Sequence, residues 1–98
     1  MANSVKISLR AQNDLIEAYE WYEEQSIGLG DRFSKIVYSD INIIANDPFV
    51  YKIAKRNLRE FVVDDFPYLI IYEYDDGIVN IIRIFHTSRN PKLKYRQK

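Results

Sequence analysis

The hydrophobic periodicity of this 98-residue chain changes at Pro48, and that change constrains the fold more than any other feature. Before it, apolar residues recur every three or four positions in two stretches, 11–26 and 29–46, which predicts two amphipathic helices. After it come runs rich in aromatic and β-branched residues, separated by turn signals, which predicts strands. The short Gly28-Leu29-Gly30 link predicts that the helices form an antiparallel hairpin.

Four strands are expected around this hairpin. The first is Val5–Leu9, and Ser8 is placed to cap the helix that follows it. The other three are 59–63, 66–74 and 78–86, the last two joined by an Asp75-Asp76-Gly77 turn. The predicted order is therefore β-α-α-β-β-β, a two-layer α+β fold with the helical hairpin packed on a small antiparallel sheet. Residues 1–98 are expected to form one domain, because the chain is too short for two cores.

Composition excludes several classes of protein. A hydrophobic fraction of 47% with 14% aromatic residues is typical of a folded domain. The chain has no cysteine, so a disulfide framework and thiolate chemistry are excluded. No apolar stretch approaches the roughly 20 residues of a membrane span, and the N-terminal MANSVKISLR lacks the apolar segment of a signal peptide. We therefore expect a cytoplasmic protein without membrane association.

The charges are unevenly distributed, although the net charge is zero. Residues 1–48 carry 4 Lys and Arg against 8 Asp and Glu, whereas residues 49–98 carry 10 against 6. Six basic residues and no acidic one lie between Arg83 and Lys98. This asymmetry indicates an anionic partner for the second half, either nucleic acid or an acidic protein, with a merely solvated basic tail as the alternative.

Arg83 lies within the last predicted strand, among apolar residues. Strict alternation predicts one face with Val79, Ile81, Arg83 and Phe85, and another with Ile78, Asn80, Ile82, Ile84 and His86. Both faces are largely apolar, so the strand is expected to be central. A buried arginine must then be paired or open onto a ligand surface. Glu60 and Glu73 are the carboxylates expected to be available to it.

Chemistry on RNA is one possibility for the basic half. Cleavage through a 2′-hydroxyl needs groups that exchange protons and cations that stabilise the phosphorane charge. His86 or Tyr95 would exchange protons, and Arg59 or Arg83 would stabilise charge. A lone histidine that closes a strand is more often structural, however, and no group of residues has metal-ligand spacing. No metal site and no cofactor are therefore expected.

Binding is the other possibility, and it draws on a wider set of cations. These residues could frame a cationic face for a target or an inhibitor. The candidate binding residues are Lys52, Lys55, Arg56, Arg59, Arg83, Arg89, Lys92 and Lys94.

Taken together, these segments resemble the RelE/ParE superfamily, the toxins of bacterial type II toxin–antitoxin modules. The resemblance runs from Ile7 to Pro91, through "AQNDLIEAYEWYEEQSIGLGDRF" and "LREFVVDDFPYLIIYEYDDGIVNIIRIFHTSRNP". It implies a helical hairpin against a small antiparallel sheet. It also implies a cognate antitoxin that wraps the toxin in a hetero-oligomer, and a role in growth inhibition and plasmid stabilisation.

The superfamily implies two modes of action. RelE-like toxins are ribosome-dependent mRNA endonucleases that use Lys and Arg with a C-terminal proton-transfer residue, whereas ParE-like toxins poison DNA gyrase. The ending "IIRIFHTSRNP" resembles the ParE-like strand, and zero net charge suits a ribosomal RNA ligand poorly. We therefore predict a ParE-like toxin that targets gyrase, with the mRNA endonuclease and a non-toxic antitoxin-binding regulator as alternatives. Whether the protein is an enzyme stays open.

Overall fold

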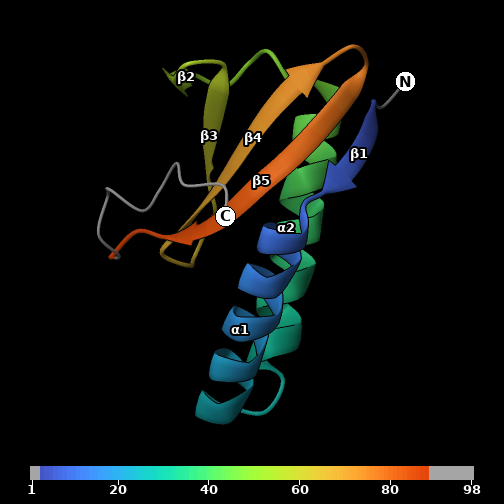
Figure 1. Ribbon diagram of the computed structural model, residues 1–98. Coiled ribbons are helices and arrows are strands. Elements are labelled where there is room, and N and C mark those ends of the chain that lie inside the picture. The colour runs from blue at the N-terminus through green and yellow to red at the C-terminus, as the bar shows by residue number, and fades with distance from the viewer. Residues whose placement is uncertain (1–2, 89–98) are drawn as a thin grey trace.

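The structure is a computed structural model that describes residues 3–88, and its elements follow the predicted order with one addition (Figure 1). The additional element, β2, is a strand of only 3 residues between the second helix and the strands that follow. In chain order the elements are β1 (Ser4–Ile7), α1 (Leu9–Gln25), α2 (Leu29–Asn46), β2 (Ile53–Lys55), β3 (Leu58–Val62), β4 (Tyr68–Asp75) and β5 (Ile78–His86).

The strands form one five-stranded sheet in the order β1-β5-β4-β3-β2. β3–β4 and β4–β5 pair antiparallel, as predicted, and the additional strand β2 pairs antiparallel with β3. β1 differs, because it runs parallel to β5, from Ser4 opposite Ile78 to Ile7 opposite Ile81. The sheet is thus mixed, and the prediction of a purely antiparallel sheet is corrected at this edge. The alternation of residues in a strand does not specify the direction of its neighbour.

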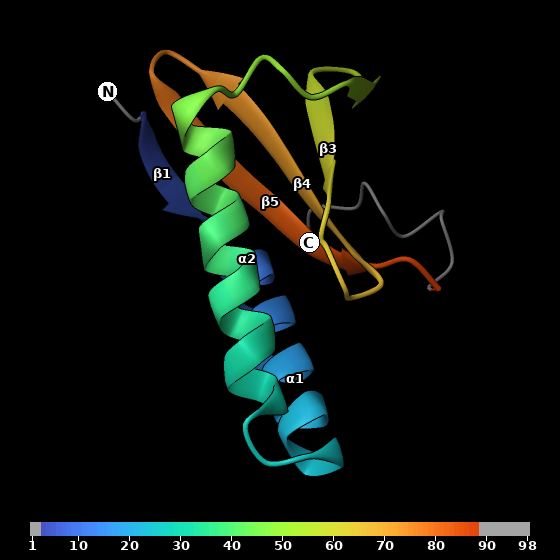
Figure 2. The same ribbon diagram turned by 180° about the vertical axis from the view of Figure 1, so that it is seen from behind.

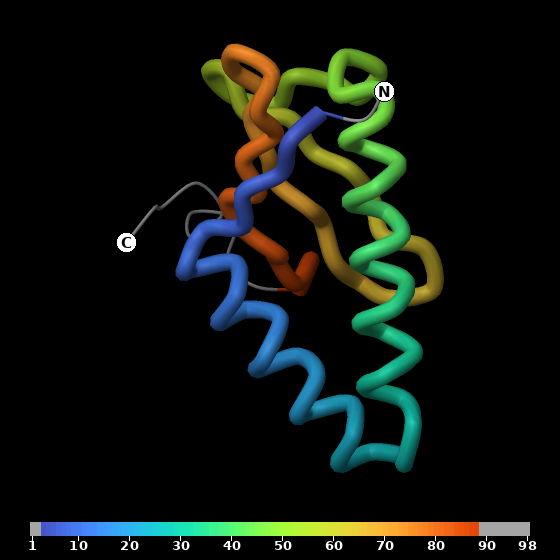
Figure 3. The backbone as a smooth tube through the Cα atoms, turned by 90° about the vertical axis from the view of Figure 1, so that its right-hand side faces the viewer, coloured from blue at the N-terminus to red at the C-terminus, as the bar shows by residue number. Residues whose placement is uncertain are grey.

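The two helices form the predicted hairpin, which extends beyond the sheet (Figure 3). Ser8 caps α1 as expected, since its hydroxyl accepts a hydrogen bond from the Ala11 N–H at 3.0 Å. At the tip, the Glu23 carboxylate accepts from the N–H groups of Gly28 and Gly30. A Cβ at Gly30 would lie 2.6 Å from the Tyr19 carbonyl oxygen, so the close helix approach requires glycine. No helix among residues 3–88 is long and apolar enough to cross a membrane.

The core lies between this hairpin and one face of the sheet, which the view in Figure 2 shows with α2 in front. Its centre is aromatic: Tyr22, Phe33 and Phe66 have ring centroids 4.9–5.2 Å apart. Fully buried aliphatic residues from both layers surround these rings, among them Val37, Ile44, Ile70, Val79 and Ile81. Burial of this apolar area supplies the main driving force for folding.

A β-bulge in β5 changes which of its residues face the helices. Tyr72 pairs with Ile81 and Ile71 pairs with Arg83, so Ile82 is an extra residue. Val79 and Ile81 face the helical core, and after the bulge Ile84 does so as well. The predicted grouping of Val79 and Ile81 with Arg83 and Phe85 is therefore wrong, because Arg83 and Phe85 lie on the opposite face.

The opposite face of the sheet carries a second apolar cluster. Leu58, Ile71 and Phe85 come from β3, β4 and β5, and each is at most 2% exposed. Leu69 and Ile82 pack against them. The sheet is therefore apolar on both faces at its centre, which agrees with the prediction that β5 is a central strand.

Candidate functional site

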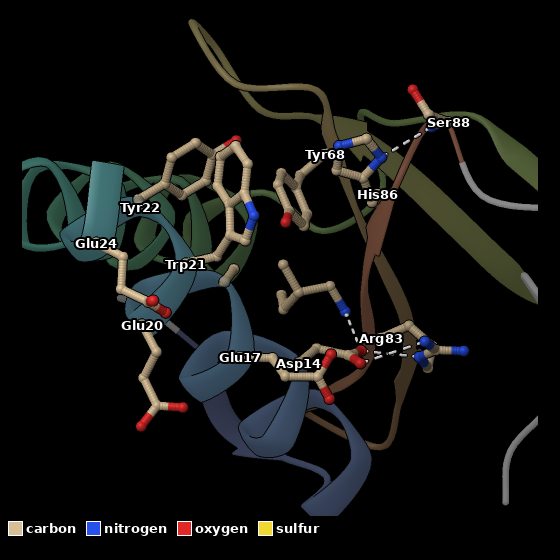
Figure 4. Close-up of a pocket in the computed structure, with 12 residues that line it drawn as sticks. Asp14, Glu17, Glu20, Trp21, Tyr22, Glu24, Tyr68, Arg83, His86 and Ser88 are labelled. Carbon is tan, nitrogen blue, oxygen red and sulfur yellow. Dashed lines mark hydrogen bonds and ion pairs between the residues drawn. The ribbon is translucent and has the colours of Figure 1, made fainter. Parts of the chain in front are cut away.

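A pocket lies between α1 and the end of β5, with a volume of ≈ 600 Å³ (Figure 4). We call it the α1–β5 pocket. One wall is a face of α1, and the other is the last part of β5 with Tyr68 of β4. Its lining residues are Asp14, Glu17, Ala18, Glu20, Trp21, Tyr22, Glu24, Tyr68, Arg83, Ile84, His86 and Ser88.

The pocket exists because β1 is shorter than the strand it borders. The β1–β5 pairing ends at Ile81, where the Ser8 N–H still donates to the Ile81 carbonyl. Beyond that point α1 takes the place of a strand. The Ser8 hydroxyl donates to the Ile82 carbonyl at 2.9 Å, and the Ile84 N–H donates to Asp14 Oδ2 at 3.0 Å. Side chains at the start of α1 thereby satisfy edge groups that would otherwise be buried without partners.

Arg83 is paired with Asp14, and both residues line the pocket. Its Nε donates to Asp14 Oδ2 at 2.8 Å and its Nη2 donates to Oδ1 at 3.2 Å, a bidentate geometry. The two side chains are only 2% and 11% exposed, and the guanidinium also lies 5.4 Å from the Phe85 ring centroid. Pairing was one of the two alternatives expected for Arg83, and the ion pair is formed with neither Glu60 nor Glu73, the carboxylates expected to be available to it. Asp14, which is 69 positions away in the chain, is the partner.

His86 is the last residue of β5, and its ring contacts two neighbouring residues. Its Nδ1 accepts a hydrogen bond from the Ser88 N–H at 3.0 Å, which leaves the proton of the neutral ring on Nε2. The ring also meets Tyr68 edge-on, with centroids 5.0 Å apart. These contacts agree with the structural role that was predicted as the more common one for a lone histidine at a strand end.

The α1 wall of the pocket is acidic and aromatic. Glu17, Glu20 and Glu24 follow each other at helical spacing on the side that lines the pocket (Figure 4). Trp21 lies among them and is 56% exposed, while its ring meets Tyr22 edge-on at 5.1 Å. Arg83 neutralises the charge of Asp14. The three glutamates therefore give the described lining of the pocket a net negative charge. Glutamates at this spacing predict only a polar helix face, so the pocket could not be found from the sequence.

The cations predicted from the second half of the chain are distributed over separate places. Lys52, Lys55 and Arg56 are exposed on β2 and its flanking residues, at the sheet edge far from α1. Arg59 is half-buried and donates to two backbone carbonyls, those of Phe49 at 3.3 Å and Tyr51 at 2.6 Å. The predicted residues Arg89, Lys92, Lys94 and Tyr95 lie outside the described residues.

The described members of the predicted nuclease set do not meet at one point. Arg59 pairs with Tyr72 on the helix-facing side of the sheet, whereas Arg83 pairs with Ile71 on the opposite side. His86 pairs with Tyr68, four positions along β4 from Tyr72, which places it roughly 13 Å from the Arg59 position along the strand. Each of the three side chains is already engaged with protein atoms.

One further carboxylate is buried away from the pocket. Asp40 of α2 is 7% exposed, and its Oδ2 has no hydrogen-bond partner within the described part of the chain. Burial, with a smaller contribution from the nearby Asp64 carboxylate, raises the pKa of Asp40 to about 6. Within residues 3–88, no group of three or more His, Asp and Glu side chains is arranged to hold a metal ion.

Comparisons with known proteins agree with this architecture. The family model for the ParE toxin of the type II toxin–antitoxin system parDE matches residues 5–91. Among solved structures, a chain from the chromosomal ParDE TA system of P. aeruginosa superposes with a TM-score of 0.80. The match covers 89% of this chain and 98% of that chain at 13% sequence identity, so it concerns the fold. No curated protein matched this sequence.

Proposed function

Because the chain belongs to the family of ParE toxins of type II toxin–antitoxin systems, we propose that it is the toxic half of such a module. It arrests growth by binding DNA gyrase, and a cognate antitoxin neutralises it in a hetero-oligomer. The observation that carries this proposal is the α1–β5 pocket, an acidic and aromatic recess beside an open strand edge. Such a recess fits a protein segment.

The chemistry of the pocket indicates what kind of segment it binds. Trp21 and Tyr68 offer apolar surface that an aliphatic or aromatic anchor would cover. Glu20 and Glu24 favour basic side chains beside that anchor. Past the bond to Asp14, the β5 edge still presents the Ile84 C=O and the His86 N–H, and no described strand pairs with it there. We infer that the antitoxin contributes a basic, amphipathic segment.

Two observations support a protein target over a ribosomal RNA substrate. First, Arg83 is 1% exposed and bound to Asp14, so it is not available to a phosphate. Second, the net charge of the chain is zero. A domain that binds RNA makes many phosphate contacts through Lys and Arg, so an excess of positive charge would be expected. A toxin that acts by binding needs an exposed surface and no assembled proton-transfer site.

Two experiments test the proposal. In the first, the protein is induced in bacterial cells that lack the antitoxin. In the second, the purified protein is added to DNA gyrase in a supercoiling assay. Growth should stop on induction, and the purified protein should inhibit supercoiling. Primer extension on cellular messages distinguishes the runner-up, because only an endonuclease gives cuts in phase with codons. Normal growth with the protein shown to accumulate would refute the toxin role itself. Arrest without supercoiling inhibition would refute gyrase as the target.

The antitoxin site is tested by reversing charge on the α1 wall. Glu20→Lys with Glu24→Lys should weaken the antitoxin complex by at least about tenfold, since two attractive contacts become repulsive. Asp75→Lys with Asp76→Lys is the matched control, because it makes the same charge change on exposed residues of the β4–β5 turn. Titration calorimetry with the protein encoded beside the toxin gene measures both. Equal affinities for the two variants would contradict the pocket assignment.

A further inference from the structure

A second surface lies at the other edge of the sheet, around β2. Three large apolar side chains are exposed there: Phe49 at 63%, Val50 at 62% and Ile53 at 48%. They belong to the segment that links α2 to β2 and to β2 itself, the outermost strand of the sheet on that side (Figure 1). We call Phe49 to Arg56 the β2 corner. Apolar side chains gathered in this way on a surface often mark a site of protein interaction.

The β2 corner is held in place by internal contacts. Arg59 donates to the carbonyls of Phe49 and Tyr51, and the buried Tyr72 hydroxyl donates to the Pro48 carbonyl at 2.8 Å. The Phe49 ring lies between two partners, with its centroid 4.8 Å from that of Tyr74 and 5.4 Å from the Arg59 guanidinium carbon. The exposed apolar groups are therefore displayed on an ordered segment, and binding would require little further ordering.

The backbone conformation of Arg56 is one that destabilises the β2 corner. It has a φ of +55°, a left-handed conformation that favours glycine or asparagine. It occupies the two-residue connection between Lys55 and Leu58, where a hairpin turn ordinarily has such residues. A long cationic side chain at this position is strained and exposed. Strain of this kind tends to persist where a side chain serves a function.

The charge of the corner limits what it can bind. Between Phe49 and Arg59 the chain has four cations and no acidic residue. Lys52, Lys55 and Arg56 are exposed beside the apolar trio, an arrangement with an apolar centre and a cationic rim. A nucleic acid would use the rim and leave Phe49, Val50 and Ile53 uncovered. A protein that presents an apolar socket bordered by carboxylates would use both parts.

We propose that the toxin binds its target through the β2 corner, and that the target is a protein with an acidic surface at the contact. The inference rests on the proposed function, and it specifies where the toxin binds its target and what charge the target surface carries. The corner and the α1–β5 pocket lie at opposite edges of one sheet. Target binding and antitoxin binding are therefore separable by mutation.

The central experiment replaces Arg56 with glycine in the full chain. Arg56→Gly removes the cation and relieves the strain, so the melting temperature should rise by roughly 4–8 °C. Growth arrest on induction and affinity for DNA gyrase should nevertheless fall, the affinity by about tenfold. Asp76→Gly is the matched control. Asp76 also has a positive φ, of +49°, in an exposed turn that is not part of the corner, so its replacement should stabilise the fold without loss of toxicity.

A second variant tests the apolar centre. Phe49→Ser with Ile53→Ser should abolish growth arrest at matched accumulation, whereas Val62→Ser, at an equally exposed position on β3, should not. Both corner variants should still bind the antitoxin with wild-type affinity. The affinity for the antitoxin also reports that the variants are folded.

The outcomes separate the inference from the function on which it rests. Wild-type protein that accumulates without stopping growth would refute the toxin role and the inference together. Wild-type arrest that Arg56→Gly and the double serine variant retain in full would overturn the corner alone. Arrest accompanied by codon-phased mRNA cuts would show that the cations serve RNA, which contradicts a protein target. Loss of antitoxin binding in the corner variants would contradict the separation of the two surfaces.

Discussion

The two edges of the sheet are built by different means. At the α1–β5 pocket, a buried ion pair between Asp14 and Arg83 joins the helix to the strand. At the β2 corner, the side chains of Arg59 and Tyr72 donate hydrogen bonds to backbone carbonyls of the loop between α2 and β2. The pocket wall is acidic, whereas the corner is basic. Both surfaces expose large apolar residues, Trp21 on one and Phe49 on the other.

The comparison shows that charge type alone does not indicate function. Arg83 and Arg56 are both arginines of the basic half, yet one is 1% exposed and structural while the other is exposed on a strained turn. A buried charge that is bound to its partner holds the fold together and has little capacity left for a ligand. The exposed charge contributes little to stability, so it is available for recognition. Four substitutions test this distinction.

Removal of Asp14 should have the largest effect. Asp14→Ala leaves Arg83 charged and buried and also deprives the Ile84 N–H of its acceptor. We expect the free energy of unfolding to fall by about 3–5 kcal/mol, measured by urea denaturation. The double variant Asp14→Leu with Arg83→Met removes both charges and should recover part of that loss, because the Ile84 N–H still lacks its acceptor. If Asp14→Ala alone were as stable as the wild type, the ion pair would not be what anchors α1 to β5.

Asp40 differs from Asp14, because it is a buried carboxylate whose Oδ2 has no hydrogen-bond partner among residues 3–88. Its pKa is raised to about 6, so the native state binds a proton more tightly than the unfolded chain. The favourable contribution of Asp40 is complete below pH ~4 and is lost as the pH rises through about 6. Asp40→Asn should therefore stabilise the protein by about 1–3 kcal/mol at pH 7.5.

The pH dependence of that difference is the check on the Asp40 prediction. Thermal unfolding of the wild type and Asp40→Asn from pH 4 to pH 8 should give curves that converge at the acidic end. Asp64→Asn, which removes the neighbouring charge and leaves Asp40 buried, should give a smaller gain of the same sign, because burial is the larger cause of the shift. A constant difference across this pH range would contradict the assignment.

Tyr72→Phe probes the support of the β2 corner. The change removes the donor to the buried Pro48 carbonyl and leaves the ring in place, so the expected loss of stability is about 1–2 kcal/mol. The loop before β2 should also become less ordered, which hydrogen exchange at Phe49 and Val50 would report. Tyr74→Phe is a suitable control, since its hydroxyl donates instead to the side chain of Asn3, which precedes β1 at the other edge of the sheet. Unchanged exchange in Tyr72→Phe would show that Arg59 suffices.

Trp21→Ala should change stability least, by about 0.5–1 kcal/mol, because the side chain is more than half exposed. Its effect on antitoxin affinity should be larger than its effect on folding, as expected of an aromatic anchor. Calorimetry with the antitoxin and thermal unfolding of the free toxin measure the two quantities. A loss of stability that equals or exceeds the loss of binding energy would make Trp21 a core residue.

Much of the fold could be predicted from the sequence, because it depends on local patterns. The spacing of apolar residues in 29–46 predicted α2 with the observed bounds, and the alternation in 78–86 did the same for β5. Ser8 was predicted as a cap from its chemistry alone and occupies that position. The strand β2 was missed because 3 exposed residues show no periodicity.

The site was harder to predict, because its geometry depends on contacts between distant residues. The Asp14–Arg83 pair joins residues 69 positions apart, and nothing local connects them. A single bulge residue, Ile82, moved Arg83 to the face opposite the one that alternation predicts. The row of glutamates on α1 was visible in the sequence, but its position opposite β5 follows only from the packing of the two elements. For the same reason the left-handed conformation of Arg56 could not be predicted.

The most direct test of two separate surfaces is the growth of cells that produce each toxin variant with and without the antitoxin. Glu20→Lys with Glu24→Lys should stop growth in both conditions, because its target surface is intact and its antitoxin pocket is not. Arg56→Gly should permit growth in both conditions while it still binds the antitoxin. The account would be contradicted if the antitoxin restored growth to the Glu20/Glu24 variant as fully as to the wild type, or if Arg56→Gly remained as toxic as the wild type.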